Sequence, residues 1–571
     1  MVENYNTEYS YDGYEIYKIK RDEKLLYLGS KYNMKNEIET LQKKIKQISD
    51  LNAIVIFGSV NGAWLEELDA VMTDKKILIV EPEKFLAEKL KNREYNVYKN
   101  EIKLLCMEDE DLYNNLLSVI KVSNIKCFVF SNYDFIYKEK FDELIDNLKH
   151  VASDVRIREN TSNYFSKIWF KNYLENIPYL FEADSINSYR NMYKNKPAII
   201  VSSGPSLDKN LKLLKGQEDK FIVIAVGRSL KAMEDVGVKC DFTAVIDGED
   251  VMYKIFEQSL HSKIPLLFNE QSSSEIIKRY SGEKIFFSTR EFLPADEHIL
   301  EVSPITLFQG GSVAHACVDF ARVLGCDTII FIGQDLAYTD DKTHANNSKA
   351  GFENNVFVDE TNLYVKGVKK EIVKTSAEFN IFRSRLEMMI KLYTNIRFIN
   401  ATEGGAHIEG TIEKDLGDVL NEYNKRIDKT KKNESFNEWI FRDVVLENLR
   451  EIYMDLNNTI NLCNKARRIS RNLPNSYVIN NNLYCEMMNK LDNIDVKIRK
   501  NSKINYLFET VIISINNCYA NNFNFDEKSI TTREKIKLHS QKSEFLYNEL
   551  SKAFEYGKPL IKDCINKLEA R

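Results

Sequence analysis

Four short apolar runs, each followed by small polar residues, constrain the fold of this chain more than any other feature. The first run occupies residues 197–201 and leads into Ser202, Ser203 and Gly204. Uncharged, β-branched runs suit strands that are covered on both faces, as in a parallel sheet flanked by helices. A turn of Ser and Gly lets backbone N–H groups approach an anion, and Pro205 suits the first turn of a helix, whose N-terminus attracts negative charge. We therefore predict a buried strand that leads into a nucleotide-binding turn.

The other three runs repeat this arrangement. They occupy residues 221–226, 242–246 and 328–332. Arg228 follows the second run, Asp247 the third and Asp335 the fourth. The carboxyl ends of parallel strands meet at one rim of a sheet, and ligands of open α/β sheets bind at that rim. These side chains are therefore predicted to converge on one site.

Three motifs in this region carry a family resemblance. They are the Gly-Pro-Ser-Leu turn at 204–207, the Gly-Gln-Asp-Leu-Ala-Tyr motif at 333–338 followed by His344, and the segment 400–406. At these residues the chain resembles the motility-associated factor (Maf) glycosyltransferases, and the resemblance covers about residues 185–412. It implies a central α/β catalytic domain similar to that of bacterial sialyltransferases.

The resemblance also implies a substrate and an acceptor. Members of the Maf family are implicated in attaching nonulosonic acids, of the pseudaminic or legionaminic type, to Ser and Thr of flagellin during flagellar assembly. The Gly-Pro-Ser-Leu turn and the Gly-Gly-Ser helix start at 310–312 are similar to those of sialyltransferases that use CMP-sugars. We therefore expect a CMP-sugar donor, flagellin as partner and no other cofactor.

Residues in the turns after strands and at helix starts are expected to contact the nucleotide. They are Ser203, Gly204, Pro205, Ser206, Arg228, Asp247, Gly311, Ser312 and Gly333. Helix N-termini and the Ser hydroxyls would hold phosphate. Two alternatives stay open: Arg228 is a phosphate clamp or a surface ion pair, and Asp247 and Asp335 bind ribose or cytosine or cap the next element.

Glycosyl transfer needs a group that accepts a hydroxyl proton and groups that stabilise the leaving phosphate. His344 lies in a polar loop and is the preferred base, because histidine titrates near neutral pH. Tyr338 would donate a hydrogen bond to the leaving phosphate. Asp335 is the third residue that we assign to catalysis. The sugar or acceptor pocket is assigned to Thr402, Glu403, Gly404 and His407.

A rival interpretation rests on the acidic loop 335–341. An archaeal hydroxymethylpterin diphosphokinase shares the same core, and carboxylates beside a phosphate-binding turn would hold Mg²⁺ for diphosphate transfer from ATP. A minimal pterin kinase needs neither flank of the core, so the long flanks of this chain favour the transferase. A third interpretation, a nucleotide-binding adaptor without catalysis, is disfavoured because the polar strand ends are present.

Length and composition set the remaining limits. The 571 residues include 80 basic and 85 acidic side chains, a balance that gives no reason to expect nucleic acid. The nine cysteines form no CxxC pair, so no structural zinc site is expected. With no apolar run of about 18 residues, we expect a cytoplasmic protein without a membrane span. The sequence leaves homo-oligomer formation open.

Four segments are expected: a Rossmann-like α/β domain at 1–150, a linking helix at 151–184, the catalytic domain at 185–412 and an all-α domain at 413–571. In the first, a strand at 53–57, a turn at 58–62, a helix at 64–71 and a strand at 77–81 form a βαβ unit that ends in Glu81. Such an acid binds ribose in cofactor sites, but Val60 stands where that motif requires glycine, so a scaffold is preferred. In the last segment, amphipathic helices are predicted at 439–456, 496–515 and 538–553.

Overall fold

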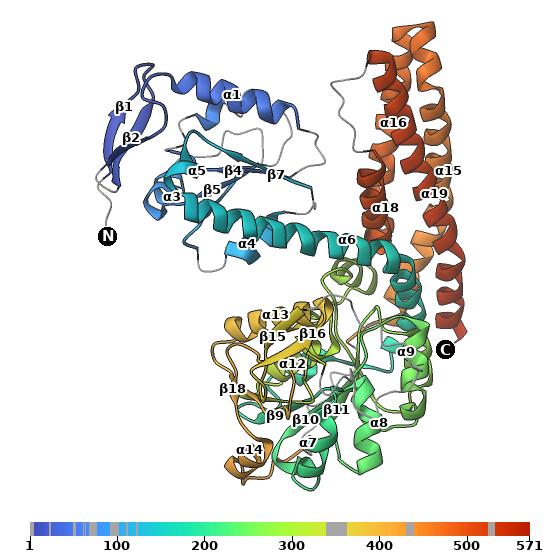
Figure 1. The fold of residues 1–571 in the computed structure, drawn as a ribbon. Coiled ribbons are helices and arrows are strands. Elements are labelled where there is room, and N and C mark those ends of the chain that lie inside the picture. The colour runs from blue at the N-terminus through green and yellow to red at the C-terminus, as the bar shows by residue number, and fades with distance from the viewer. Residues whose placement is uncertain are drawn as a thin grey trace. The chain divides into compact units, whose positions relative to one another are not determined.

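A computed structural model describes residues 5–21, 24–48, 53–60, 62, 64–67, 77–91, 102–109, 112–120, 124–338, 363–429, 439–523 and 531–570 (Figure 1). The chain forms two compact units. One unit comprises Met1–Tyr164, Arg467–Met488 and Ile513–Leu546. The other comprises Phe165–Ala466, Asn489–Ile512 and Tyr547–Arg571.

The central sheet has nine parallel strands in the order β18-β17-β14-β9-β10-β11-β12-β13-β8. The strands are β8 (Asp184–Ser185), β9 (Pro197–Val201), β10 (Ile222–Val226), β11 (Phe242–Ala244), β12 (Leu266–Phe268), β13 (Lys284–Phe286), β14 (Thr328–Ile332), β17 (Arg397–Asn400) and β18 (Ile412–Glu413). Every residue of β9, β10, β11, β12 and β14 is buried, as their uncharged composition predicts. The four predicted strands are confirmed.

Helices and a two-stranded ribbon complete this domain. The helices are α7 (Leu207–Leu214), α8 (Gly227–Val236), α9 (Asp250–Phe256), α10 (Ser274–Arg279), α11 (Leu293–Ala295), α12 (Val313–Val323), α13 (Ala377–Leu392) and α14 (Leu416–Glu422). The ribbon pairs β15 (Leu363–Lys366) with β16 (Ile372–Thr375) in antiparallel fashion. Ile200 and Ile224 pack with Phe320 of α12 in one core cluster, and the alternate strand residues point to the opposite face of the sheet.

The strand order changes direction between β9 and β14. From β9 the chain runs through β10, β11, β12 and β13 on one side, and β14 then pairs with β9 on the other side. Open α/β sheets bind ligands in the crevice that such a change of direction opens at the carboxyl ends of the strands. The turns after β9 and β14 therefore mark the expected site.

The N-terminal region contains a parallel sheet in the order β6-β5-β4-β7 and an antiparallel sheet β1-β2-β3. The strands are β1 (Asn6–Tyr9), β2 (Glu15–Arg21), β3 (Lys24–Leu28), β4 (Ala53–Phe57), β5 (Ile77–Glu81), β6 (Ile102–Cys106) and β7 (Ile125–Val129). The helices are α1 (Met34–Lys46), α3 (Lys84–Lys91), α4 (Leu112–Val119) and α5 (Tyr133–Ile136). The predicted strands at 53–57 and 77–81 are confirmed, whereas residues 68–71 of the predicted helix lie outside the described residues.

The ligand crevice of this N-terminal sheet is filled by the protein's own side chains. Glu81 is fully buried and accepts hydrogen bonds from the backbone N–H and the hydroxyl of Ser59. The Tyr133 hydroxyl accepts a hydrogen bond from the Val60 N–H at 2.8 Å, and Val60 has a φ of +58° that a β-branched residue rarely adopts. Burial raises the pKa of Glu81 to about 8. Glu81 is thus not accessible to a cofactor in this structure, which favours the scaffold interpretation.

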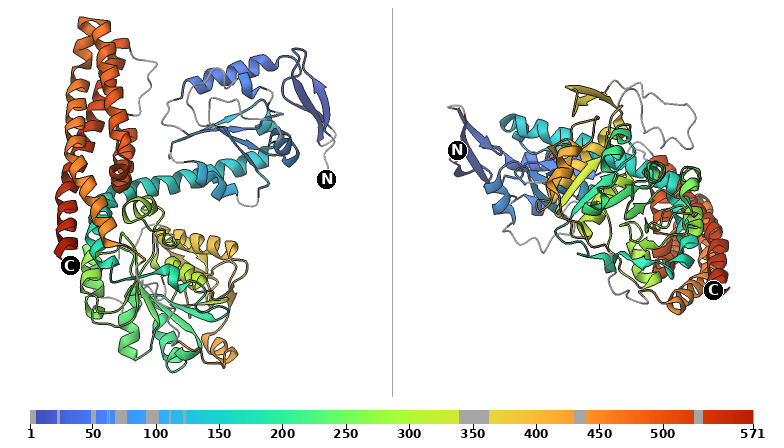
Figure 2. Two further views of the ribbon diagram at one scale, coloured as in Figure 1. Left: turned by 180° about the vertical axis from the view of Figure 1, so that it is seen from behind. Right: turned by 90° about the horizontal axis from the view of Figure 1, so that it is seen from below.

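Long helices make up the rest of the chain. They are α6 (Lys138–Leu180), α15 (Arg442–Ile479), α16 (Asn481–Lys500), α17 (Ser502–Leu507), α18 (Glu509–Asn522) and α19 (Thr532–Ala570). Helix α6 crosses the segment boundary placed at 150. Figure 2 shows α15 and α19 side by side, and Arg450 Nη2 lies 2.6 Å from Glu569 Oε1 between them. The prediction of one helix at 496–515 is wrong, because Asn501 accepts from the Ile504 N–H and caps a new helix.

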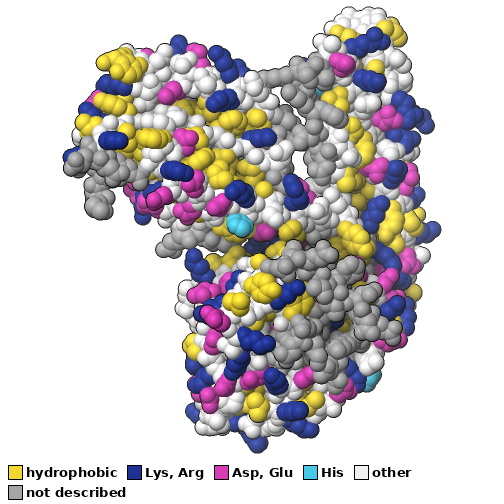
Figure 3. All heavy atoms as spheres, in the orientation of Figure 1, with side chains coloured by type: hydrophobic (Ala, Val, Ile, Leu, Met, Phe, Trp, Pro, Cys, Tyr) yellow, Lys and Arg dark blue, Asp and Glu magenta, His cyan; other side chains and the backbone are white. Residues whose placement is uncertain are grey.

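Basic and acidic side chains are interspersed on the face drawn in Figure 3, in keeping with the balanced composition. In the part of the chain that the structure describes, no helix is long and apolar enough to cross a membrane.

We expect Gly58→Ala to destabilise the N-terminal sheet more than Gly13→Ala does. Both glycines have a positive φ, +93° at Gly58 and +94° at Gly13, so both substitutions cost about 1 kcal/mol of backbone strain. A Cβ at Gly58 would also lie 2.4 Å from the Tyr133 ring, whereas a Cβ at Gly13 meets no atom within 4 Å. Thermal unfolding of both variants tests this difference, and equal loss would show that Tyr133 does not fill the crevice.

Candidate functional site

The turns after β9 and β14 are joined by one buried carboxylate. Asp335 is 2% exposed and accepts two hydrogen bonds from Ser206, from its N–H at 3.0 Å and from its hydroxyl at 2.5 Å. The Gly204 N–H donates to the Gly333 carbonyl at 2.8 Å. A Cβ at Gly204 would lie 2.6 Å from that carbonyl and 2.7 Å from the Asp335 carboxyl group, so only glycine fits there.

This geometry changes the expected roles of Ser206, Gly204 and Asp335. The N–H groups of Gly204 and Ser206, which we predicted to hold phosphate, are bonded within the protein. Helix α7 begins at Leu207 rather than at Pro205, with Ser206 as its N-cap residue. Asp335 thus binds the turn before α7 rather than capping the element that follows it, because a buried carboxylate needs donors. The half-buried residues Ser203, Gly204 and Pro205 form the accessible part of the turn.

The loop after β17 closes over Asp335. The Ala406 N–H donates to the Asp335 carbonyl at 2.7 Å, and a Cβ at Gly405 would lie 2.2 Å from the same oxygen. Thr402 is 2% exposed, and its hydroxyl has no hydrogen-bond partner among the described residues. Gly404 is buried, and Glu403 lies 3.9 Å from the Lys369 ammonium group. Of the predicted pocket residues in this loop, Thr402 and Gly404 are therefore enclosed rather than accessible.

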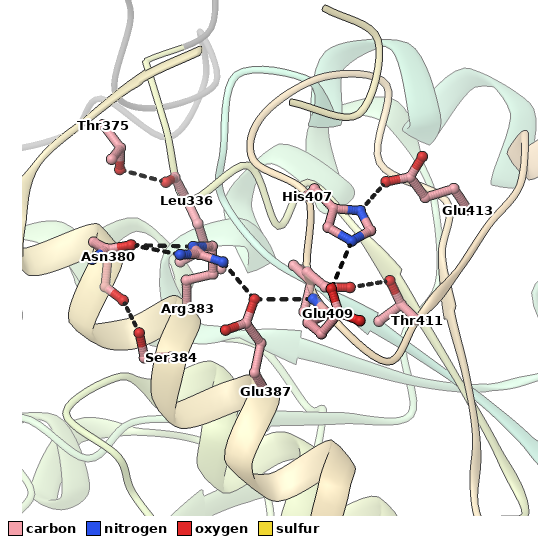
Figure 4. A network of polar contacts seen from close by, with 11 residues as sticks. Leu336, Thr375, Asn380, Arg383, Ser384, Glu387, His407, Glu409, Thr411 and Glu413 are labelled. Atoms are coloured by element: carbon pink, nitrogen blue, oxygen red, sulfur yellow. Dashed lines mark hydrogen bonds and ion pairs between the residues drawn. The ribbon is translucent and has the colours of Figure 1, made fainter. Parts of the chain in front are cut away.

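The end of the Gly333–Tyr338 motif is held by β16. Leu336 has a φ of +49°, and its carbonyl accepts from the Thr375 hydroxyl at 2.8 Å (Figure 4). A strained backbone conformation persists only where the surrounding structure holds it in place. Residues of this kind are often found at functional sites. The Tyr338 N–H donates to the Lys374 carbonyl, and its ring lies 6.0 Å from that of Phe379. The predicted base His344 and the acidic residues Asp340 and Asp341 lie outside the described residues.

His407, the fourth predicted pocket residue, belongs to a polar network beside α13. Its ring contacts Glu413 through Nδ1 and Glu409 through Nε2 (Figure 4). Glu387 of α13 accepts from the Glu409 N–H at 2.9 Å and pairs with Arg383. His407 is thus engaged by carboxylates and stabilises the end of the loop.

Arg228 and Asp247 lie further along the same rim. Arg228 is half-buried at the start of α8, and burial lowers its pKa while the nearby Asp247 opposes that shift. Asp247 has a solvent-accessible side chain, yet protein closely surrounds its carboxyl group. This loss of hydration raises the pKa of Asp247 to about 6; repulsion from Glu249 and Glu378 adds to the shift, and Arg228 opposes it.

The turn before α12 has a basic neighbour that sequence reasoning missed. Ser312 caps α12 by accepting from the Ala314 N–H, and Gly310 and Gly311 both have positive φ. Arg385 of α13 donates to the Gly310 carbonyl at 2.9 Å. A Cβ at Gly311 would lie 2.9 Å from Nη1 of the Arg385 guanidinium. No signal in the sequence places α13 beside α12.

The side chain of His315 packs against the turn that precedes α12 and contacts two backbone carbonyls. It is buried, as predicted for a hydrogen-bonded core histidine, and its ring nitrogens lie 3.1 Å and 3.0 Å from the carbonyls of Gln309 and Phe382. Burial lowers the pKa of His315 to about 4.

Two buried acids and two asparagines at this rim were also missed. Glu270 and Asp296 are 1% and 0% exposed, and the Ser288 hydroxyl lies 2.7 Å from the first and 2.6 Å from the second. One hydroxyl hydrogen serves one carboxylate, so the other carboxyl group must carry a proton. Burial and the neighbouring Asp296 raise the pKa of Glu270 well above its usual value. The amides of Asn172 and Asn176 in α6 are the second missed pair.

These asparagines hold the loops that follow β11 and β12. The Asn172 amide donates to the carbonyls of Gly248 and Gln271, each at 3.0 Å. The Asn176 amide donates to the carbonyls of Glu270 and Ser272. The sequence gives one indication of this loop-holding role, which is that these polar residues lie within a helix predicted to link two domains. Among the described residues, no group of three or more His, Cys, Asp or Glu side chains is arranged to hold a metal ion.

Comparisons with known proteins found one matching family model and a similar solved structure. Residues 171–341 match the model of the 6-hydroxymethylpterin diphosphokinase MptE-like family. The whole fold is similar to the solved structure of a Maf glycosyltransferase from Magnetospirillum magneticum AMB-1, with a TM-score of 0.56 and 13% sequence identity over 99% of this chain and 93% of that one. No curated protein sequence matches this chain.

The chain therefore shares its fold with a solved Maf glycosyltransferase and contains a region that matches the MptE-like family model. The chain resembles the Maf glycosyltransferases in fold, as the motifs at 204–207 and 333–338 led us to expect, and its α/β regions and long helices confirm the predicted fold class.

We expect Ser206 and Asp335 to be strongly coupled in stability. Ser206→Ala and Asp335→Asn should each cost about 1–3 kcal/mol, because each weakens the hydrogen bonding between two buried polar groups. The double variant should lose less than the sum of the two, with an interaction of about 0.5–3 kcal/mol. Denaturant unfolding of the four proteins measures it, and additive losses would contradict the bond.

Stability of the central domain should fall as the pH rises through neutrality, and Glu270→Gln should weaken this fall. The raised pKa of Glu270 means that the folded state keeps a proton that the unfolded state loses, so unfolding is favoured as the pH rises above about 4.3. An amide at this position does not titrate. Melting temperatures between pH 5 and 9 test this, with the exposed Glu291→Gln as control; identical pH profiles would refute the shared proton.

Proposed function

We propose that this protein is an O-glycosyltransferase that moves a nonulosonic acid, of the pseudaminic or legionaminic type, from a CMP-sugar to Ser or Thr of flagellin. The observation that carries the proposal is the accessible turn Ser203–Pro205 at the change of strand direction, in a chain that shares its fold with a Maf glycosyltransferase along nearly its whole length. In this proposal the enzyme acts in the cytoplasm, needs no cofactor and supports flagellar assembly and motility.

The proposed nucleotide site follows the rim. Ser203, Gly204 and Pro205 form the accessible edge of the crevice. Arg228, one strand away, supplies a cation whose partial burial strengthens its attraction for phosphate. Ser312 and the adjacent guanidinium of Arg385 supply a second anion contact at the start of α12.

Several residues keep the roles expected from the sequence. Tyr338 is proposed to donate to the leaving phosphate, and Glu403 to line the sugar pocket. Asp335 holds the two turns together in the structure, so its proposed part in catalysis is to keep the crevice in shape. His344 stays a prediction for the base.

The second candidate function is Mg²⁺-dependent diphosphate transfer from ATP to a hydroxymethylpterin. The family match over residues 171–341 favours it, since that family is described as diphosphokinase-like. The match covers less than a third of the chain, whereas the shared glycosyltransferase fold extends over both flanks. An enzyme that modifies a folded protein has a use for those flanks, which ranks the transferase first.

Ligand-dependent stability separates the two candidates. CMP at 100 times its dissociation constant should stabilise the protein by about 2.7 kcal/mol. Melting temperatures are measured with CMP, CTP, ATP with Mg²⁺, and S-adenosylmethionine. Arg228→Ala should lose the CMP effect and Lys212→Ala, an exposed cation on α7, should keep it. Stabilisation by ATP with Mg²⁺ alone would refute the transferase in favour of the kinase.

A further inference from the structure

The polar groups of the rim stand in a fixed order along the sheet. Asp335 follows β14, Ser203 follows β9, Arg228 follows β10 and Asp247 follows β11, and these four strands are adjacent. Neighbouring strands lie about 4.8 Å apart, so Asp247 stands about 10 Å along the rim from the turn at Ser203. A donor whose phosphate lies between Ser203 and Arg228 can therefore extend its sugar toward Asp247.

Asp247 is an exposed residue two strands along the rim from the turn at Ser203. Asp335 is buried and engaged by Ser206, and Glu270 is buried beside Asp296. Neither of these two acids can meet a substrate without a change in structure. Asp247, in contrast, has a solvent-accessible side chain.

The backbone around Asp247 is rigidly held. The Asp247 carbonyl accepts from the Ser273 N–H at 3.0 Å, and the next carbonyl, of Gly248, accepts from the Asn172 amide at 3.0 Å. A Cβ at Gly248 would lie 2.5 Å from the Gln271 carbonyl and 2.6 Å from the Asn172 amide nitrogen. The main chain is thus held at Asp247 and at the residue that follows it, as a positioned catalytic group requires.

The charges that face Asp247 come from three elements. They are Arg228 at the start of α8, Glu249 in its own loop and Glu378 at the start of α13. The two acids and the poor hydration oppose ionisation of Asp247, and Arg228 favours it. The resulting pKa of about 6 leaves the carboxylate ionised at neutral pH and more basic than an ordinary aspartate.

We propose that Asp247, and not His344, is the catalytic base of the transfer, an assignment that rests on the proposed function. Asp247 removes the proton from the Ser or Thr hydroxyl of the acceptor. The acceptor oxygen forms a bond to the anomeric carbon, and the bond from that carbon to the phosphate oxygen of CMP breaks, its electron pair leaving with CMP. Asp247 then releases the proton to water.

Single-turnover transfer tests the assignment with the full-length protein, CMP-pseudaminic or CMP-legionaminic acid as donor and flagellin as acceptor. Rates are measured from pH 5 to 9 for the wild type and for Asp247→Asn, Asp247→Glu and His344→Asn. Asp250→Asn, an exposed acid at the start of α9, is the matched control. CMP binding by calorimetry and melting temperature are measured for each protein.

Asp247→Asn should lower the rate by about 10²–10⁴-fold, abolish the fall in rate below pH 6 and leave CMP affinity unchanged. Asp247→Glu should recover part of the rate, and His344→Asn should keep the fall below pH 6. The assignment is overturned if Asp247→Asn keeps that fall, or if it weakens CMP binding without slowing transfer. A wild type that binds no CMP, or transfers from neither donor, overturns the proposed function itself and this assignment with it.

Discussion

The central domain depends on the contact between Asp335 and Ser206. These residues are 129 positions apart in the chain, and their bond joins the turns after two neighbouring strands at the point where the strand order reverses. Around it, Gly204, Gly333 and Gly405 approach other backbone atoms so closely that any Cβ would lie within 2.7 Å of one. A buried carboxylate is stable only when donors surround it, so the need to satisfy Asp335 sets the shape of the crevice.

The chain contains this type of strand arrangement twice, with opposite results. In the N-terminal sheet β7 and β5 flank β4, and the crevice at the strand ends is filled by Tyr133 and by the bond between Glu81 and Ser59. In the central sheet β14 and β10 flank β9, and the corresponding turn keeps Ser203–Pro205 at the surface. Side chains, and not the topology, therefore decide which of the two strand-end turns is covered by the protein itself.

Local pattern and local chemistry explain what the sequence predicted well. Uncharged β-branched runs located four strands of the central sheet, and the glycine and serine turns located the rim. The sequence did not show that Ser206 would be used by Asp335, because that contact depends on strand pairing across 129 residues. It also missed Arg385, Asn172 and the pair of Glu270 and Asp296, whose roles arise from packing between elements distant in the chain. The helix predicted at 496–515 failed because a single asparagine can start a new helix within an amphipathic pattern.

The crowding at the three glycines divides the rim into two kinds of position. At these glycines a backbone atom occupies the space that a side chain would need. A substitution there would displace the backbone of the rim, so it would disturb the fold before it could change which ligand binds. Ser203 and Arg228 are half-buried and Asp247 is exposed, and none of them is a glycine that the backbone crowds in this way. A redesign of the proposed transferase for a different donor would therefore vary these three positions and leave the crowded glycines unchanged, so that the backbone of the domain stays the same while its contacts are exchanged.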